Sequence, residues 1–543
     1  MGWALVLVLA TVIVAGMVLG MLGTCPASAW ADGVPGSDLR ASRTVRVALG
    51  VDQTGVRLTG RGEHELWNLA TGALVGRASQ GAVWILALCA EGIQVSLAPV
   101  VVPGAPGQQD LLGDPQPIGV FTGPLRLRSL GAPPADTVSA SLRQEGISLP
   151  GGAVPPPGMG WERGPDAPAT FLWYGGLGYR GEMEVFPGRA GLTVVNVIPL
   201  EEYLYGVVGI EMSPSWPAEA LKAQAVAART YAVGKLAASQ AASGQSGPSQ
   251  GGGYDLLATP VDQAYRGLRV ESGQGNGAVE ATRGRVLTYQ GRLASAFYHA
   301  SSGGHTENVE NVWGTPLPYL RGVPDPEEGS PWQHWEKEIS LADVGAALAA
   351  GGKDVGEVYR IEPAGPQGVS GRWTQLAVIG SRGRVVLTGS QFYRLVGLRS
   401  ACFQMEPCQP GIGDYVQPVV ANGQVQVLSG QGRQVAMSVK GTAVVSATGL
   451  TRLGQAASSS STPPAWLFPS PPSPEPSSSP VYVVARRWLP ARIHFTGSGW
   501  GHGVGMSQYG ARTLALRGYT YDRILGYYYQ GTVLQETPVV SAK

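Results

Sequence analysis

Apolar and polar residues alternate in several segments of the first two hundred residues, and this pattern predicts strands. The alternation is clearest over residues 45–49 and 93–97, where every second side chain would face a core. Residues 192–198 predict another strand. Between residues 100 and 170 glycine and proline are frequent, which predicts long loops. The N-terminal part is therefore expected to consist mainly of sheet.

The pattern changes near residue 218, where an alanine-rich segment predicts a helix. Residues 213–217 supply the serine and the prolines that often precede or open a helix. Over residues 218–237 an apolar stripe begins at Leu221 and repeats at helical spacing. Because alanine side chains are short, this helix is expected to lie buried against sheet. The Gly, Ser and Gln residues of 238–253 are expected to end it as a flexible loop.

A second apolar run opens the chain and indicates export. No charged residue occurs between Trp3 and Gly23, a length sufficient to cross a bilayer. Two Ala-x-Ala sequences follow within residues 27–31 and are typical of signal-peptide cleavage sites. Residues 1–31 are therefore predicted to be a signal peptide or an N-terminal membrane anchor. In an exported protein Cys402 and Cys408 are close enough in sequence to pair as a disulfide.

The overall charge argues against nucleic acid as a partner. The 543 residues include 39 Lys and Arg against 38 Asp and Glu, a formal net charge of +1, and nucleic-acid binding calls for a basic surface. Residues 454–480 are rich in proline and serine and predict a disordered linker or insertion loop.

The segment that follows this tract, GSGWGHGVGMSQYGA at 497–511, has six glycines in fifteen residues. Glycine is unfavourable inside helices and strands, so such density predicts unusual backbone angles or a close approach to another group. If the group is a ligand, His502, Gln508 and Tyr509 would add polar and stacking contacts. The alternative is that the glycines allow tight packing within the protein and that His502 hydrogen-bonds backbone.

Glu211 is the candidate catalytic residue. It follows the mostly apolar residues 206–210 and precedes Met212 and Trp216, and apolar surroundings favour the neutral form of a carboxyl. A neutral carboxyl near pH 7 is what a general acid requires. The N-terminus of the following helix would favour the anion instead. The alternative interpretation is that Glu211 only caps that helix.

A metal site is a weaker possibility. His299 and His305 lie near Glu307 and Glu310, and two imidazoles with a carboxylate can bind Zn²⁺. The two histidines are not spaced as i, i+4 on a helix, so the alternative is that they hydrogen-bond a Gly/Ser loop. The chain has no Gly-x-Ser-x-Gly nucleophile motif at the serines of the glycine-rich segment.

Residues 200–233 and 497–511 resemble the two signature segments of the SpoIID/LytB family. Further similar segments are 262–267, 297–314, 387–398 and 515–534. The resemblance covers most of residues 41–401 and 488–535. It implies a strand-rich α+β domain with the alanine-rich helix buried, interrupted by an insertion at 402–487 that contains the Pro/Ser tract.

The resemblance also implies a function. Well-known members are exported, membrane-anchored lytic transglycosylases that cleave peptidoglycan strands between N-acetylmuramic acid and N-acetylglucosamine, and their catalytic glutamate matches Glu211. Other members are amidase enhancers, which gives the alternative of a non-catalytic envelope factor that binds peptidoglycan or a cell-wall amidase. A role in sporulation is one option among the family's roles.

The resemblance suggests which residues would contact the glycan, although a structural role is an equal alternative for the first three. The implied contacts are Lys222, Arg229, Tyr231, His502, Gln508 and Tyr509. No cofactor is expected. Some members hold zinc with His and Cys, but no cysteine lies near His299 and His305 here.

Overall fold

The computed structural model describes residues 44–101, 111–131, 171–246, 253–408, 412–419, 424–428, 434–438, 445–446, 449–450, 481–488 and 492–536. The predicted signal or anchor at 1–31 and the Pro/Ser tract at 454–480 lie outside these ranges. Within them, no helix combines the length and apolar character needed to span a bilayer.

Two sheets form the N-terminal half, and the strands expected at 45–49, 93–97 and 192–198 are confirmed. One sheet has the order β15 (Leu256–Leu257), β1 (Thr44–Gln53), β14 (Leu192–Pro199), β13 (Glu182–Pro187), β10 (Leu125–Gly131), β3 (Glu63–Asn68) and β4 (Leu74–Ala78). The other has the order β12 (Leu177–Tyr179), β11 (Leu172–Tyr174), β2 (Gly55–Gly60), β5 (Val83–Cys89), β6 (Gly92–Ala98) and β9 (Gln116–Phe121). Strands β9 and β10 lie where only loops were expected, so that part of the prediction was wrong.

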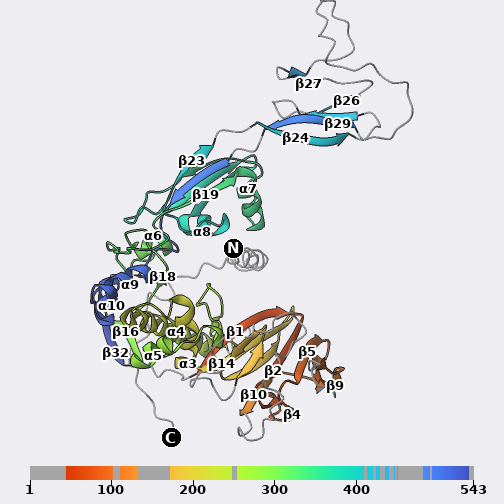
Figure 1. The fold of residues 1–543 in the computed structure, drawn as a ribbon, viewed down its shortest axis with the longest axis vertical. Coiled ribbons are helices and arrows are strands. Elements are labelled where there is room, and N and C mark those ends of the chain that lie inside the picture. The colour runs from red at the N-terminus through yellow and green to blue at the C-terminus, as the bar shows by residue number, and fades with distance from the viewer. Residues whose placement is uncertain are drawn as a thin grey trace, which may run out of the picture.

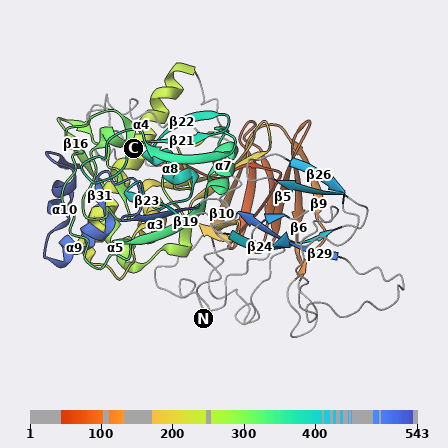
Figure 2. The same cartoon turned by 90° about the horizontal axis from the view of Figure 1, so that it is seen from above.

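Helices lie beside the first of these sheets, next to β1 and β14 (Figure 1, Figure 2). They are α3 (Leu200–Glu211), α4 (Ala218–Ser246), α5 (Gly273–Ala281), α9 (Gln508–Leu516) and α10 (Tyr521–Tyr528). Helices α3 and α4 contact the sheet, and the other three pack on α4. Helix α4 begins where the sequence predicted but continues past residue 237, because the Ala, Ser and Gln residues there tolerate helical backbone well enough. The alanines Ala220, Ala223, Ala225, Ala227, Ala228 and Ala232 are fully buried, so neighbouring elements approach this helix closely.

The same core takes in short strands from the C-terminal half. They are β16 (Arg285–Tyr289), β17 (Arg292–Leu293) and β32 (Val533–Glu536) in one sheet, and β18 (Tyr298–His299) beside β31 (Met506–Ser507) in another. Buried residues of β16, β31, α9 and α10 pack in one hydrophobic cluster with those of α3 and α4. Residues near the C-terminus therefore complete a core that begins at β1.

A second hydrophobic core lies farther along the molecule (Figure 1). Its elements are β19 (Trp335–Ser340), α7 (Leu341–Ala350), β20 (Val358–Pro363), β21 (Gln375–Gly380), β22 (Gly383–Thr388), α8 (Gly389–Leu395), β23 (Phe403–Cys408) and β30 (Arg492–Gly497). Helix α6 (Val309–Trp313), β18 and α9 belong to the part of the first core that lies nearest the second one (Figure 1).

Strands β23 and β30 are antiparallel neighbours, with Cys408 opposite Arg492. Residues 408 and 492 therefore lie side by side, and between them in the sequence β24 (Ile412–Val419) pairs with β29 (Val481–Trp488). Residues 403–408 fell within the insertion predicted from the sequence. They instead join the second core, where Phe403 is buried.

The expected disulfide between Cys402 and Cys408 does not form. Cys402 is a free thiol whose Sγ lies 3.4 Å from the carbonyl oxygen of Ser370. The residues that follow it are extended in β23, and six positions at about 3.3 Å each separate the two Cα atoms by roughly 20 Å. A disulfide requires Cα atoms closer than about 7 Å.

Deleting residues 454–480 is expected to leave stability and activity almost unchanged. The tract's composition cannot bury enough apolar surface to offset the entropy of ordering it, and the chain around it leaves and returns at adjacent strands. The melting temperature should change by less than about 2 °C, the lower end of the shift that 1 kcal/mol produces in a domain of about 150–250 residues. A larger fall measured by differential scanning calorimetry would show that the tract packs on the folded protein.

Candidate active site

Two segments distant in the sequence meet at Glu211. This residue ends α3, and Gln508 begins α9. The Gln508 side-chain amide donates a hydrogen bond of 2.7 Å to Glu211 Oε2, across 297 positions of the chain. Helix α9 starts here because Ser507 caps it, accepting from the backbone N–H of Gly510 at 3.1 Å. The cap therefore fixes Gln508 opposite the carboxyl.

The surroundings of Glu211 raise the pKa of its carboxyl to about 7. Burial is the main cause, and the hydrogen bond from Gln508 opposes it by favouring the anion. Glu211 also lies at the C-terminal end of α3, whose partial negative charge adds to the cost of ionisation. Helix α4, whose N-terminus was expected to favour the anion, begins at Ala218, seven residues after Glu211.

Two tyrosines lie near the carboxyl and were not singled out from the sequence. Burial raises the pKa values of Tyr203 and Tyr298, and the negative charge of ionised Glu211 raises both further. Gln263 links the two rings: it accepts from the Tyr203 hydroxyl at 3.1 Å and donates to the Tyr298 hydroxyl at 2.9 Å. Since Tyr298 accepts this bond, its own proton is available for a ligand. In the sequence, only the position of Tyr298 within the segment FYHASSGG, one residue before His299, indicated that it could belong to the site.

Two pairs of half-buried aromatic rings include residues that neighbour this group in the sequence. Trp216 and Tyr509 meet edge to face with centroids 4.9 Å apart. Phe297, which precedes Tyr298, and Trp313 have centroids 4.6 Å apart, and Trp313 lies 4.9 Å from His502. Tyr509 directly follows Gln508, whose amide bonds Glu211, and its role as a stacking residue stays a prediction.

His502 is held neutral. Its Nδ1 accepts a hydrogen bond from the backbone N–H of Val504 at 3.0 Å. Burial, together with the positive charges of Arg394 and Arg372, lowers its pKa to about 3. The imidazole therefore carries no charge near pH 7, and its Nδ1 is occupied by backbone. These contacts support the alternative that His502 hydrogen-bonds the backbone of the protein and does not contact a ligand.

The glycines around His502 approach the protein itself. Gly503 has φ +85°, and a Cβ there would lie 2.6 Å from the guanidinium carbon of Arg372. Gly505 has φ +73°, and a Cβ there would lie 2.1 Å from the carbonyl oxygen of Phe297. Larger residues would both strain the backbone and clash. The glycines therefore allow the backbone of this segment to pass closely between residues 297–303 and Arg372.

Lys222 and Tyr231 have partners within the protein. The ammonium group of Lys222 forms a 2.7 Å salt bridge with Glu219 and lies 6.0 Å from the ring centroid of Tyr521. The Tyr231 hydroxyl donates to Asp262 at 3.2 Å. Both residues are on α4, and these contacts support the structural alternative for each.

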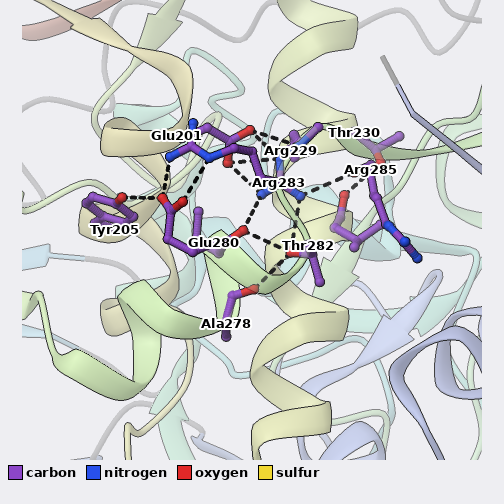
Figure 3. A network of polar contacts seen from close by, with 12 residues as sticks. Glu201, Tyr205, Arg229, Thr230, Ala278, Glu280, Thr282, Arg283 and Arg285 are labelled. Atoms are coloured by element: carbon purple, nitrogen blue, oxygen red, sulfur yellow. Dashed lines mark hydrogen bonds and ion pairs between the residues drawn. The ribbon is translucent and has the colours of Figure 1, made fainter. Parts of the chain in front are cut away.

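Arg229 is buried in a polar network away from solvent (Figure 3). Its Nη2 lies 2.7 Å from Glu201 Oε2, and its Nε donates to Glu201 Oε1 at 2.9 Å. The remaining donors reach the carbonyl oxygens of Val279 and Arg285 at 3.1 and 3.2 Å. With its guanidinium enclosed by these groups, Arg229 joins α3, α4, α5 and β16. It does not face a ligand as the resemblance implied.

The two candidate zinc ligands have other contacts. Nδ1 of His299 lies 3.2 Å from the carbonyl oxygen of Val504, and Nδ1 of His305 lies 2.7 Å from that of Thr306. Among the residues that the structure describes, no three His, Cys, Asp or Glu side chains are grouped to hold a metal ion. The donor set for zinc is therefore incomplete at this place.

Comparison with known proteins points to one family. Residues 188–289, which include Glu211, match the family model described as "SpoIID: Stage II sporulation protein". Stage II sporulation protein D of Bacillus subtilis is 28% identical over 363 residues, covering 64% of this chain and 78% of that protein. The amidase enhancer of Bacillus subtilis is 32% identical over 341 residues, covering 61% of this chain and 40% of that protein.

A further relative has no assigned role. An uncharacterized protein of Brachyspira hyodysenteriae is 35% identical over 174 residues, covering 32% of this chain and 45% of that protein. The chain thus spans less than half the length of this relative and of the amidase enhancer.

Proposed function

Because this chain carries a SpoIID family domain, we propose that it remodels the bacterial cell wall as a lytic transglycosylase, with Glu211 as its acid and base. The substrate is the peptidoglycan strand, cut between N-acetylmuramic acid and N-acetylglucosamine. The segment 1–31 would direct the protein out of the cytoplasm and, if retained, attach it to the membrane. No cofactor enters the proposal.

One carboxyl suffices for this reaction. Protonated Glu211 gives its proton to the glycosidic oxygen, and the bond from that oxygen to the anomeric carbon of muramic acid breaks. The 6-hydroxyl of the same sugar then bonds to the anomeric carbon and returns its proton to the Glu211 carboxylate. The products are a 1,6-anhydromuramic end and a free 4-hydroxyl on the glucosamine. A hydrolase would instead use two carboxyl groups and water.

The observation that carries the proposal is the state of Glu211. With a pKa of about 7 the carboxyl is partly protonated at neutral pH, so it can act as an acid and then as a base. Gln508 fixes its orientation through the 2.7 Å bond to Oε2, and the next residue, Tyr509, forms an aromatic pair with Trp216. The decisive test is mass analysis of peptide-free strands after incubation with the protein. Anhydromuramic ends are expected.

The second candidate function is that of an amidase enhancer. It is favoured by the 32% identity to a protein of that name. Its signature would be faster turnover by an added cell-wall amidase with no new anhydromuramic ends. That result would replace the enzyme proposal.

The lytic rate is expected to fall as pH rises through about 7. The acid form of Glu211 is the reactive form in the first step, and above its pKa of about 7 it declines about tenfold per pH unit. Initial rates of anhydromuramic end formation between pH 5 and 9 measure this decline. A rate that stays constant to pH 9 would remove Glu211 from the role of acid.

Changing Gln508→Leu is expected to move this decline to higher pH. The Gln508 amide stabilises the anion of Glu211, so its loss raises the pKa of the carboxyl further. The exposed Gln375→Leu on β21 serves as the matched control and should leave the pH profile unchanged. An unshifted profile for Gln508→Leu would show that the hydrogen bond does not set the protonation of Glu211.

A further inference from the structure

The hydrogen-bond directions around Gln263 leave one hydroxyl hydrogen of the candidate active site unused. The carbonyl oxygen of Ala228 can only accept, so Gln263 presents Nε2 to it, at 3.2 Å. The other hydrogen of this Nε2 goes to the hydroxyl oxygen of Tyr298 at 2.9 Å, and Gln263 Oε1 accepts from Tyr203 at 3.1 Å. The Tyr298 oxygen is therefore an acceptor in this bond, and its own hydrogen points elsewhere.

This hydrogen has no acceptor among the residues that the structure describes, because the only hydrogen bond of the Tyr298 hydroxyl is the one it accepts. Burial raises the pKa of Tyr298 well above its ordinary value, so the hydroxyl keeps its hydrogen near pH 7. A donor without an acceptor is unfavourable in such surroundings. The Tyr298 side chain is nevertheless partly accessible, so a ligand can supply the acceptor.

Tyr298 lies near the carboxyl of Glu211, because both are linked to the same stretch of α4. Gln508, which donates to Glu211 at 2.7 Å, lies 3.5 Å from Gln224 Oε1. Gln263, which donates to Tyr298, bonds the backbone of α4 four residues after Gln224. Four residues of a helix correspond to about 6 Å. A single sugar linkage can therefore meet both side chains.

The Glu211 carboxyl also has one unused position. Its Oε2 accepts from Gln508, whereas no donor in the described chain reaches Oε1. An Oε2 that already accepts favours the proton of the neutral acid on Oε1. The site thus offers two hydroxyl hydrogens, one from Glu211 and one from Tyr298. An oxygen atom with two lone pairs can accept both.

We propose that Tyr298 is a second catalytic residue, which donates a hydrogen bond to the glycosidic oxygen that Glu211 protonates. As the bond from this oxygen to the anomeric carbon of muramic acid lengthens, negative charge develops on the oxygen, and a fixed donor stabilises it. Tyr298 keeps its hydrogen throughout, and the proton retained by the leaving glucosamine comes from Glu211. This inference rests on the proposed function in one respect, the lytic reaction.

The first test is Tyr298→Phe, which removes the hydroxyl and keeps the ring. Loss of one fixed donor costs about 10²–10³-fold in kcat when it stabilises a full oxyanion. Because the leaving oxygen here also receives a proton, we expect kcat for anhydromuramic end formation on peptide-free strands to fall about 10- to 100-fold, with KM nearly unchanged.

The matched control is Tyr265→Phe, which also removes a hydroxyl from a buried ring. The Tyr265 hydroxyl donates to Asn196 at 2.8 Å, so its loss should lower the melting temperature but leave kcat unchanged. Rates are measured well below the melting temperature of each variant. A loss of kcat in both variants would show that the effect of Tyr298→Phe is structural.

A substrate that needs no help for its leaving group identifies the oxygen that Tyr298 contacts. In a glycan with 4-methylumbelliferone on the anomeric carbon of its terminal muramic acid, the leaving group departs as a stabilised anion. Tyr298→Phe should then lose less than about threefold in kcat. An equal loss on this substrate and on natural strands would overturn the contact with the glycosidic oxygen.

The proposed function and this inference fail in different ways. A wild-type protein that forms no anhydromuramic ends would overturn both. An active wild-type protein whose kcat is unchanged by Tyr298→Phe would overturn the role of Tyr298 alone. A higher KM with unchanged kcat would mean that the hydroxyl only binds the glycan and would also overturn the catalytic role.

Discussion

Glu211→Gln is expected to abolish lytic activity while preserving the fold. The amide is nearly isosteric with the carboxyl but cannot supply or take up the proton, and general acid–base catalysis contributes about 10²–10⁴-fold. Because the proposed mechanism uses the same group in both steps, the loss should lie at or above the upper end of this range. The measurement is the initial rate of anhydromuramic end formation on peptide-free strands.

The matched control for this prediction is Glu202→Gln. Glu202 lies on the same helix, and burial also raises the pKa of its carboxyl, yet it has no bond to Gln508. Its loss should change the rate far less. Near-normal cleavage by Glu211→Gln would mean that the acid lies elsewhere.

Measuring the thermal stability of Glu211→Gln at two pH values shows whether a loss of activity comes from the missing proton transfer or from misfolding. The folded-state pKa of Glu211 lies above its ordinary value of 4.5. The folded protein therefore binds more protons than the unfolded chain between pH 4.5 and about 7, and ionisation of Glu211 reduces stability as pH rises through this window. Glu211→Gln, which cannot ionise, should consequently be more stable than the parent at pH 8, with a smaller difference at pH 5. A variant that is inactive and less stable at both pH values would point to misfolding.

Arg229→Met is expected to be the most destabilising of these substitutions. It leaves the carboxylate of Glu201 mostly buried with its main partner removed, and breaking a buried ion pair in this way costs about 3–5 kcal/mol. The free energy of unfolding from urea titration measures the loss. Arg229→Lys should recover only part of it, because an ammonium group cannot form the two parallel bonds to Glu201.

A double-mutant cycle identifies the cause of that loss. Combining Arg229→Met with Glu201→Gln removes both charges, so the pair should cost less than the sum of the single changes. Strictly additive costs would show that the two side chains do not interact. Normal stability of Arg229→Met with selective loss of glycan binding would return Arg229 to the role of a ligand contact.

Features that depend on neighbouring residues could be read from the sequence. The strands at 45–49 and 192–198 and the start of the helix at Ala218 follow from side-chain alternation and from helix-opening residues within short windows. The apolar surroundings of Glu211 were visible in the same way, because residues 206–210 and Met212 are its immediate neighbours. The match of residues 188–289 to the SpoIID family was likewise recognisable from motifs alone.

Only the tertiary structure decided which side chains meet. The bond between Gln508 and Glu211 joins residues 297 positions apart, and no local pattern encodes that distance. The resemblance predicted that Arg229 contacts a glycan, whereas in the folded protein α3 places Glu201 within salt-bridge distance of it. The glycines of 497–511 proved to accommodate Arg372 and the carbonyl of Phe297. Sequence windows carry the periodicity that buries one face of an element, whereas contacts between elements arise from how those faces pack, and packing involves the whole chain at once.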